Sequence, residues 1–354
     1  MSQVLPSVLQ YAMLIQNKDE KIMFKACVAA CLLIVGQGDV SAKASCVGSD
    51  RLLKRLWPEK TLTSSYSDVL NPQKAETDES MPDTSNVPAL PSLADQWRGT
   101  IRSVQPKSTA KYLAITLDYC ELCTNINGYQ SQVIQYLRKQ NVPATLFISG
   151  KWMRSHSDIT QQLMVDPLFE IGNHAWSHAS FGIAPVDMID QQVLATQAQY
   201  RVLRAQIAQQ ALAIGMVDEM NLIPDQPMLF RLPYGRCNDA ALQRLQHLGL
   251  KVIQWNHVGL EGYLATQSAC EAFVDKIQTG SIILLHGNHV PKHTLSFLQK
   301  VIPLLQKKGF TFLTVSSLLE TGSPVIKQEG YFVKPGDNLS LDTQFGFMGT
   351  GVRK

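Results

Sequence analysis

The stretch Glu170-Ile171-Gly172-Asn173-His174-Ala175-Trp176-Ser177-His178 places two imidazoles four residues apart, directly after a short apolar run. The apolar run predicts a buried strand, which Gly172-Asn173 ends, so both histidines should lie at the carboxyl end of a strand. Folds of the α/β class bind their ligands at that end. Histidines with this spacing can share one face of a helical turn and bind the same metal ion, although the pair alone is a weak signal.

Outward from this stretch, strands and helices are predicted to alternate along most of the chain. Apolar, β-rich runs cover residues 112–117, 144–148, 169–171, 228–230, 251–255, 281–285 and 310–314. Helical spacing covers residues 129–140, 152–164, 186–214, 239–248, 270–278 and 295–307. Strands that alternate with helices of about a dozen residues indicate an α/β fold with a parallel sheet and right-handed crossovers, either open or closed into a barrel.

The other candidate functional residues also follow predicted strands. Asp118, the segment Arg231-Leu232-Pro233-Tyr234-Gly235 and His286 each stand directly after one of the apolar runs. Because the carboxyl ends of parallel strands meet at one edge of a sheet, we expect these residues to share a site. Taken singly, each has an ordinary alternative: a helix N-cap, a turn with a surface ion pair, and a loop histidine, respectively.

In this order and spacing, four segments resemble the motifs of the NodB-homology polysaccharide deacetylases, a carbohydrate esterase family of the family 4 type. They are Thr116-Leu117-Asp118, Asn173-His174-Ala175-Trp176-Ser177-His178, Arg231-Leu232-Pro233-Tyr234-Gly235 and Ile283-Leu284-Leu285-His286, and the resemblance covers residues 112–319. It implies a distorted (β/α) barrel and a metal-dependent hydrolase that removes N-acetyl groups from an amino-sugar polysaccharide, either peptidoglycan or a chitin-like glycan. The alternatives are an acetyl-ester esterase acting on xylan and a carbohydrate-binding relative without catalysis.

The resemblance also implies a metal site and two catalytic residues. His174 and His178 would bind a divalent metal ion, Zn²⁺ or another. The ion would polarise the acetamide carbonyl and lower the pKa of a bound water toward ~7. Asp118 would accept the proton of that water, and His286 would protonate the departing amine. An amide is a poor electrophile with a poor leaving group, so a Lewis acid, a base and an acid must act together.

The Arg-Leu-Pro-Tyr-Gly segment is implied to bind the substrate and the oxyanion. The backbone N–H of Tyr234, which follows Pro233, would donate to the tetrahedral oxyanion. Arg231 would orient the carboxylate of the site, a role that suits its guanidinium fork.

Two positions depart from the family pattern. Tyr119 stands where the family usually has a second aspartate, which is a metal ligand. Glu121, Cys120 or a water could complete the metal site, and Glu121 is expected first because an ionised carboxylate best replaces a carboxylate. A subset of the family with a single aspartate followed by Cys-Glu resembles this chain. Asn256 stands where an aspartate is expected to tune the catalytic histidine, and Glu261 is a candidate to replace it.

The N-terminal region predicts export. Residues 23–44 read as a signal peptide, with a positive start, ten apolar residues and small residues near the end. This run is shorter than the roughly 20 residues of a membrane span, so no stable membrane span is expected. Residues 1–22 form a leader that does not fit the signal, so either Met23 is the start or the run is an internal anchor. We expect a periplasmic or extracellular location.

The rest of the chain is expected to divide into three parts. Residues 45–97 are rich in Ser, Asp, Thr and Pro and predict a flexible linker. Residues 98–323 form the deacetylase domain. Residues 324–354 form a tail that either contains a strand and turn or resembles a fragment of a LysM glycan-binding module.

The composition is that of an ordinary soluble protein: 354 residues, 45% of them hydrophobic and 17% charged, with a net charge of +3. No basic run interleaved with aromatic residues is present, so a nucleic acid is not the expected partner. The resemblance implies a polysaccharide partner. In an oxidising compartment, Cys120 could form a disulfide with Cys123 or with Cys237.

Overall fold

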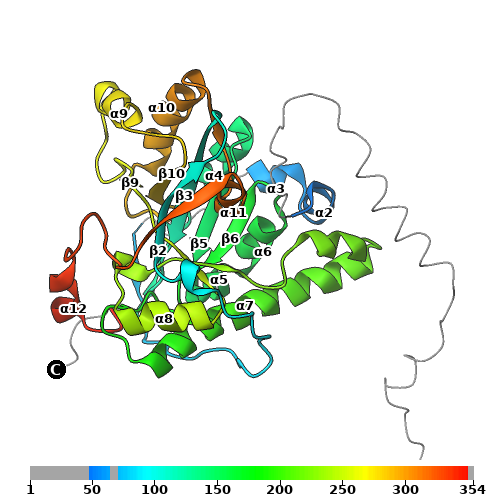
Figure 1. The fold of residues 1–354 in the computed structure, drawn as a ribbon. Coiled ribbons are helices and arrows are strands. Elements are labelled where there is room, and N and C mark those ends of the chain that lie inside the picture. Colours follow the sequence, from blue (N-terminus) through cyan, green and yellow to red (C-terminus); the bar gives the residue numbers. More distant parts are fainter. Residues whose placement is uncertain (1–47, 64–70, 350–354) are drawn as a thin grey trace, which may run out of the picture. The chain divides into compact units, whose positions relative to one another are not determined.

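The structure, a computed structural model, describes residues 48–63 and 71–349. The leader and the predicted signal peptide lie outside these ranges. Within the described ranges, no helix is both long and apolar enough to cross a membrane. Helices surround a large central sheet (Figure 1).

Seven strands of this sheet close into a barrel, which confirms the distorted (β/α) barrel expected from the sequence. Neighbours follow the order β3, β5, β6, β7, β8, β2 and β10, and β10 pairs again with β3. All these pairs are parallel except that of β2 with β10. The bounds are β2 Thr100–Pro106, β3 Lys111–Tyr119, β5 Ala144–Ile148, β6 Phe169–Asn173, β7 Leu229–Phe230, β8 Lys251–Ile253 and β10 Ser281–His286.

Short strands and helices complete the domain (Figure 1). The further strands are β1 Gln73–Lys74, β4 Asn125–Ile126, β9 His257–Val258, β11 Phe310–Phe312 and β12 Gly322–Lys327. The helices are α2 Asp50–Leu56, α3 Glu59–Thr63, α4 Ser131–Gln140, α5 Gly150–Ser155, α6 Ser157–Val165, α7 Val186–Ala213, α8 Asp239–His247, α9 Gln267–Val274, α10 Thr294–Lys307, α11 Val315–Glu320 and α12 Leu339–Phe345. Each predicted helix is present, although the one expected at 152–164 is broken at His156 into α5 and α6.

The strand register brings the four predicted motifs to one level of the barrel. His286 at the end of β10 pairs with Asp118 on β3, and Asp118 pairs in turn with Phe147 on β5. One step further, Asn173 of β6 pairs with Phe230 of β7. Because the backbone positions are aligned across neighbouring strands, the residues that follow each strand emerge at the same rim.

Strand β3 shows how one segment serves both the core and the site. Leu117 and Tyr119 point outward and join the main hydrophobic cluster with residues of the surrounding helices. Ala114 joins the inner cluster of the barrel. Thr116 and Asp118 lie on this inner face as well, where the Arg231 guanidinium contacts both. Because side chains alternate along a strand, the residues that pack against the helices and the polar residues of the candidate site lie on opposite faces of β3.

Within the described part of residues 45–97, helix α2 is packed on the domain, so the prediction of a flexible linker is wrong for this helix. Helix α2 buries Leu52 and Leu53 in the main cluster, with 0% and 5% of their surface exposed. Ser49 caps this helix, its Oγ accepting from the Leu52 N–H at 3.1 Å. The polar residues that suggested disorder instead form local turns, as where Asp83 accepts from the Ser85 N–H.

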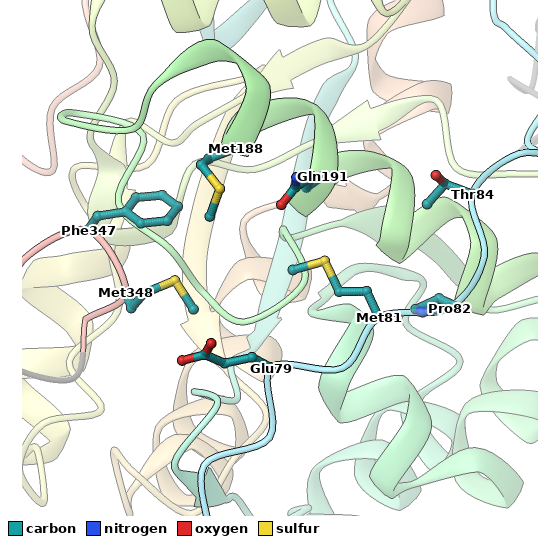
Figure 2. Close-up of a pocket in the computed structure, with 8 residues that line it drawn as sticks. All are labelled: Glu79, Met81, Pro82, Thr84, Met188, Gln191, Phe347 and Met348. Atoms are coloured by element: carbon teal, nitrogen blue, oxygen red, sulfur yellow. The ribbon is translucent and has the colours of Figure 1, made fainter.

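The C-terminal tail also belongs to the domain. Strand β12 pairs antiparallel with β2, so the boundary predicted after residue 323 divides a strand. Helix α12 then carries Asp342, which accepts a hydrogen bond from Ser180 and forms an ion pair with Arg236. Glu79 and Met81 of the segment before β2, and Phe347 and Met348 of the tail, face α7 across a cavity of about 450 Å³ (Figure 2).

Packing of α2 makes a testable difference to stability. Leu52→Ala should lower the free energy of unfolding by about 2–5 kcal/mol, because it leaves a cavity in the main cluster. Urea unfolding followed by circular dichroism measures this change. Lys54→Ala on the exposed face of the same helix is the control and should change stability little. Equal stability of both variants would mean that α2 does not pack on the domain.

Candidate functional site

The two histidines lie on a loop after β6 and not on a helical turn, so that part of the prediction is wrong. Ala175 and His178 both have left-handed backbones, with φ of 61° and 56°. Such backbones are costly for residues other than glycine and persist only where neighbours hold them. Here Asn173 Oδ1 accepts from the Ala175 N–H, and Gln192 of α7 accepts from the Ser177 N–H, both at 2.9 Å.

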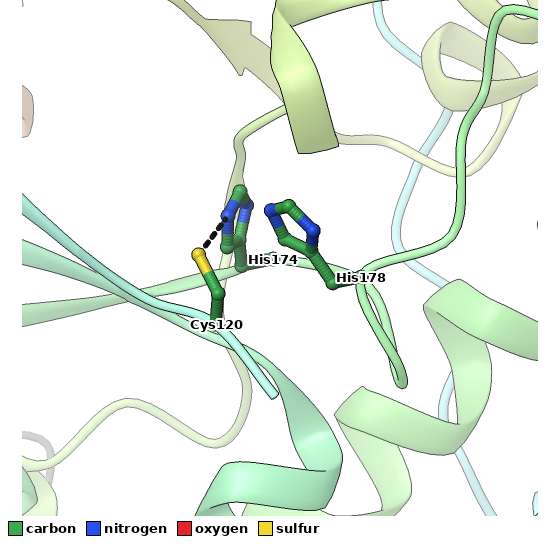
Figure 3. A group of neighbouring side chains, drawn as sticks. All are labelled: Cys120, His174 and His178. Carbon is green, nitrogen blue, oxygen red and sulfur yellow. Dashed lines mark hydrogen bonds between the residues drawn. The ribbon is translucent and has the colours of Figure 1, made fainter. Parts of the chain in front are cut away.

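The loop turns His174 and His178 toward Cys120 (Figure 3). One ligand atom from each of the three side chains lies within 4.8 Å of the others. The Cys120 Sγ is 3.4 Å from Nε2 of His174, and the other ring nitrogen of His174 donates to the Arg231 carbonyl at 2.9 Å. That hydrogen bond leaves Nε2 with its lone pair directed at the cluster.

The charge state of the cluster suits a metal ion. Burial lowers the pKa of His174 to about 3 and holds the pKa of His178 well below its ordinary value. Both imidazoles are therefore neutral at pH 7, the form that binds metals. Burial and the Asp118 charge raise the pKa of the Cys120 thiol, so a bound cation would have to displace its proton. Two imidazoles and a thiol form a donor set that fits a divalent ion.

Asp118 and Arg231 form a buried ion pair beside this cluster. Asp118 Oδ1 accepts from Arg231 Nη1 at 2.9 Å, and Asp118 Oδ2 lies 3.7 Å from His174 Nε2. Arg231 is fully buried, and its remaining donors bind Thr116 Oγ1 and the carbonyls of Ile253 and Gln254. The segment is therefore no surface turn, and the contact expected between Arg231 and the carboxylate is present.

His286 has its own carboxylate partner. Nδ1 of His286 lies 2.6 Å from Oε1 of Glu261, whose Oε2 accepts from the His286 N–H and from Thr294 Oγ1. Burial alone would lower the pKa of His286, but the charge and hydrogen bond of Glu261 raise it above its ordinary value. Asn256 instead holds the start of β10, accepting from the Ile282 N–H at 2.9 Å. Glu261 thus occupies the place for which it was a candidate.

Glu121 does not lie in the cluster, although it was the first choice as third metal ligand. Its carboxylate is fully buried and pairs with Nζ of Lys151 at 3.3 Å. It also accepts from Ser155 Oγ and from the Asn127 N–H at 3.0 Å. With both oxygens engaged in this network, Glu121 has no free position for a cation.

A cleft of about 230 Å³ opens over the cluster. His178 and Tyr234 line one part of it, and the Tyr234 backbone is left-handed with φ of 58°. Tyr234 follows Pro233 at the start of a short 3₁₀ turn. Asn71 and Asn288 also line the cleft, and the sequence carries no signal for either. Asn71 comes from the segment taken as linker, and an asparagine in a loop has no distinctive spacing.

The four cysteines that the structure describes, Cys120, Cys123, Cys237 and Cys270, form no disulfide. Neither pairing considered for Cys120 is therefore present.

Residues 105–253 match the polysaccharide deacetylase family model. A peptidoglycan-N-acetylglucosamine deacetylase of Bacillus cereus is 26% identical over 213 residues, which are 59% of this chain and 88% of that protein. A 30.6 kDa protein of Geobacillus stearothermophilus is 25% identical over 197 residues, 54% of this chain and 66% of its own length. The chain thus covers slightly less than two thirds of the latter.

A solved structure has the same fold. The crystal structure of a peptidoglycan N-acetylglucosamine deacetylase covers 63% of this chain and 94% of its own, with a TM-score of 0.50 and 21% sequence identity. At this identity the likeness concerns the fold alone. In the segment 105–253 and in its fold, the chain is therefore similar to the polysaccharide deacetylases.

Proposed function

We propose that the protein is a metal-dependent hydrolase that removes N-acetyl groups from an N-acetylglucosamine-containing polysaccharide. The observation that carries this proposal is the meeting of four strand ends at one rim of the barrel. Asp118 lies near the end of β3 and His286 ends β10, while the His174–His178 loop follows β6 and Arg231 follows β7. A carboxylate, a neutral imidazole cluster and a second, carboxylate-paired histidine are the groups that amide hydrolysis needs.

Two of these groups divide the proton transfers. The Arg231 guanidinium holds one oxygen of Asp118, and the other faces His174, where it is placed to accept a proton from an attacking water. His286, kept protonated by Glu261, donates a proton to the amine as the C–N bond breaks. Bound by His174 and His178, a divalent metal ion, in our proposal Zn²⁺, would supply Lewis-acid activation of the carbonyl and of the water.

The remaining contacts suit an oxyanion and a sugar. Pro233 and the left-handed backbone of Tyr234 place the Tyr234 main chain at the cleft, where its N–H is proposed to donate to the oxyanion. The Tyr234 ring packs on the His178 ring, with centroids 4.4 Å apart, and forms a wall for the sugar.

The substrate class is inferred from a relative. The Bacillus cereus relative is named for peptidoglycan N-acetylglucosamine, so peptidoglycan is the first substrate that we propose, with a chitin-like glycan next. Either substrate agrees with export through the predicted signal at residues 23–44. Detection of the mature chain in the periplasmic or extracellular fraction of cells tests this location.

Two alternatives are separated by their products. Ester hydrolysis on acetylated xylan would release acetate without new amines, whereas N-deacetylation releases both in equal amounts. A relative that only binds carbohydrate would release neither. The paired arrangements of Asp118 with Arg231 and of His286 with Glu261 favour catalysis over binding alone.

Variants at two positions should separate metal binding from turnover. We expect His174→Ala to lose both the metal and the activity, because it removes a ligand. Asp118→Asn should keep the metal and lose activity by about 10²–10⁴-fold, the usual contribution of a general base. Elemental analysis of the purified proteins and release of acetate from peptidoglycan and chitooligosaccharide measure both effects. Full activity in Asp118→Asn would contradict the role proposed for Asp118.

Glu261 should set the alkaline limb of the pH profile. His286 acts in its protonated form, so activity is present below its pKa and falls as the pH rises through it. Because Glu261 raises this pKa, Glu261→Gln should lower it and shift the alkaline limb of kcat to lower pH. Glu271→Gln, at an exposed position of α9, is the control and should leave the profile unchanged. An unshifted limb in Glu261→Gln would contradict the role of His286 as the acid.

A further inference from the structure

We propose that Cys120 is the third protein ligand of the metal and binds it as a thiolate. This inference rests on the proposed function, because it concerns the same metal site. It replaces the carboxylate expected from the family pattern by sulfur. When sulfur binds the cation, the thiol gives its proton to solvent, so one S–H bond is exchanged for one metal–sulfur bond.

The distances within the cluster agree with a metal site. In a tetrahedral zinc site with Zn–S of ~2.3 Å and Zn–N of ~2.0 Å, sulfur and nitrogen lie about 3.5 Å apart. Cys120 Sγ and His174 Nε2 are separated by 3.4 Å, and a ligand atom of His178 lies within 4.8 Å of both. A hydrogen bond between the Cys120 thiol and the His174 imidazole would alone explain the distance of 3.4 Å. It would not explain why His178, with its left-handed backbone, lies beside them.

The strand period explains why residue 120, and not residue 119, faces the cluster. Strand β3 continues as a regular strand through Tyr119, so successive side chains point to opposite faces. Asp118 points inward, and the ring of Tyr119 packs outward at 4.7 Å from the Trp152 ring. Cys120 is therefore the next side chain on the face of Asp118. A ligand at position 119 would require the strand to bend before that residue.

Hydrogen bonds hold the backbone of Cys120 both at its N–H and at its carbonyl. Asn288 Oδ1 accepts from the Cys120 N–H at 2.9 Å, and Nδ2 of Asn127 donates to the Cys120 carbonyl. Asn127 is itself bound through its N–H to Glu121, which the buried Lys151 anchors. Glu121 is thus a positioning residue for the ligand loop. Ligand side chains that are supported in this way keep their geometry in the absence of the metal ion.

The other acidic groups near the cluster are already engaged. Asp118 has one oxygen bound by Arg231 and the other proposed as the general base, and Glu121 is paired with Lys151. Among the residues that the structure describes, the group of metal-ligating side chains brought together is Cys120 with His174 and His178. A thiolate carries the same charge as a carboxylate, so the substitution keeps the net charge of the site. It changes the softness of the ligand, which favours Zn²⁺ and Co²⁺ over Mg²⁺ and Mn²⁺.

Cobalt substitution gives a readout that does not depend on activity. A thiolate bound to Co²⁺ produces a charge-transfer absorption in the near ultraviolet, which imidazole and carboxylate ligands do not produce. We expect the full chain loaded with Co²⁺ to show this absorption. Cys120→Ser should lose it and should weaken Zn²⁺ binding by at least about 10-fold. Cys120→Asp should bind the metal through its carboxylate and should also lack the absorption.

Cys270→Ala is the matched control, since it removes a buried thiol from α9 in another part of the domain. It should keep both the absorption and the Zn²⁺ affinity. Circular dichroism of all variants identifies any that fail to fold, and Cys120→Asp keeps the test decisive if Cys120→Ser is unstable.

The outcomes distinguish this inference from the proposed function. A wild-type protein that releases acetate but shows no charge-transfer absorption, or a Cys120→Ser variant with unchanged Zn²⁺ affinity, overturns the assignment of Cys120 and leaves the deacetylase proposal standing. A wild-type protein with the absorption but without acetate or amine release supports Cys120 as ligand and overturns the activity. A folded wild-type protein that binds neither Zn²⁺ nor Co²⁺ overturns both.

Discussion

The ion pair of Asp118 and Arg231 is the interaction on which the rest of the site depends. Both side chains are buried, and the arginine binds groups from β3, from the last residue of β8 and from the residue after it. Its carbonyl also orients His174. A buried pair of this kind contributes little net stability, yet removal of one partner costs about 3–5 kcal/mol because it leaves a charge without compensation. Catalytic geometry and barrel closure are therefore enforced by the same contacts.

Other residues of the candidate site are likewise held in place by hydrogen bonds to neighbouring groups. Glu261 fixes His286, the Arg231 carbonyl fixes His174, and Asn127 and Asn288 fix the backbone of Cys120. Each of these supports comes from a different segment of the chain. The side chains of the candidate site are consequently held by contacts within the chain itself, which is the condition under which fixed charges and dipoles act strongly.

Sequence patterns predicted the strands well because apolar runs bounded by glycine, asparagine or charged residues have few other solutions, and residues 112–117 and 281–285 became β3 and β10. They failed where tertiary contacts decide. Glu121 was preferred to Cys120 as the third metal ligand because of its charge alone. In the structure its carboxylate binds Lys151, which lies thirty positions away in the sequence. A polar composition suggested a linker before β2, yet two leucines anchor α2 in the core.

The segment that the family model matches is shorter than the folded domain. The matched family segment ends at residue 253, before β10 delivers His286 and before β12 joins β2. At its other end it leaves out α2 and the Asn71 wall of the cleft. A piece cut to residues 105–253 would lack β10 and most of β2, so the seven-stranded barrel could not close. An expressed fragment therefore has to extend beyond both ends of the matched segment, so that it includes β2 and β10.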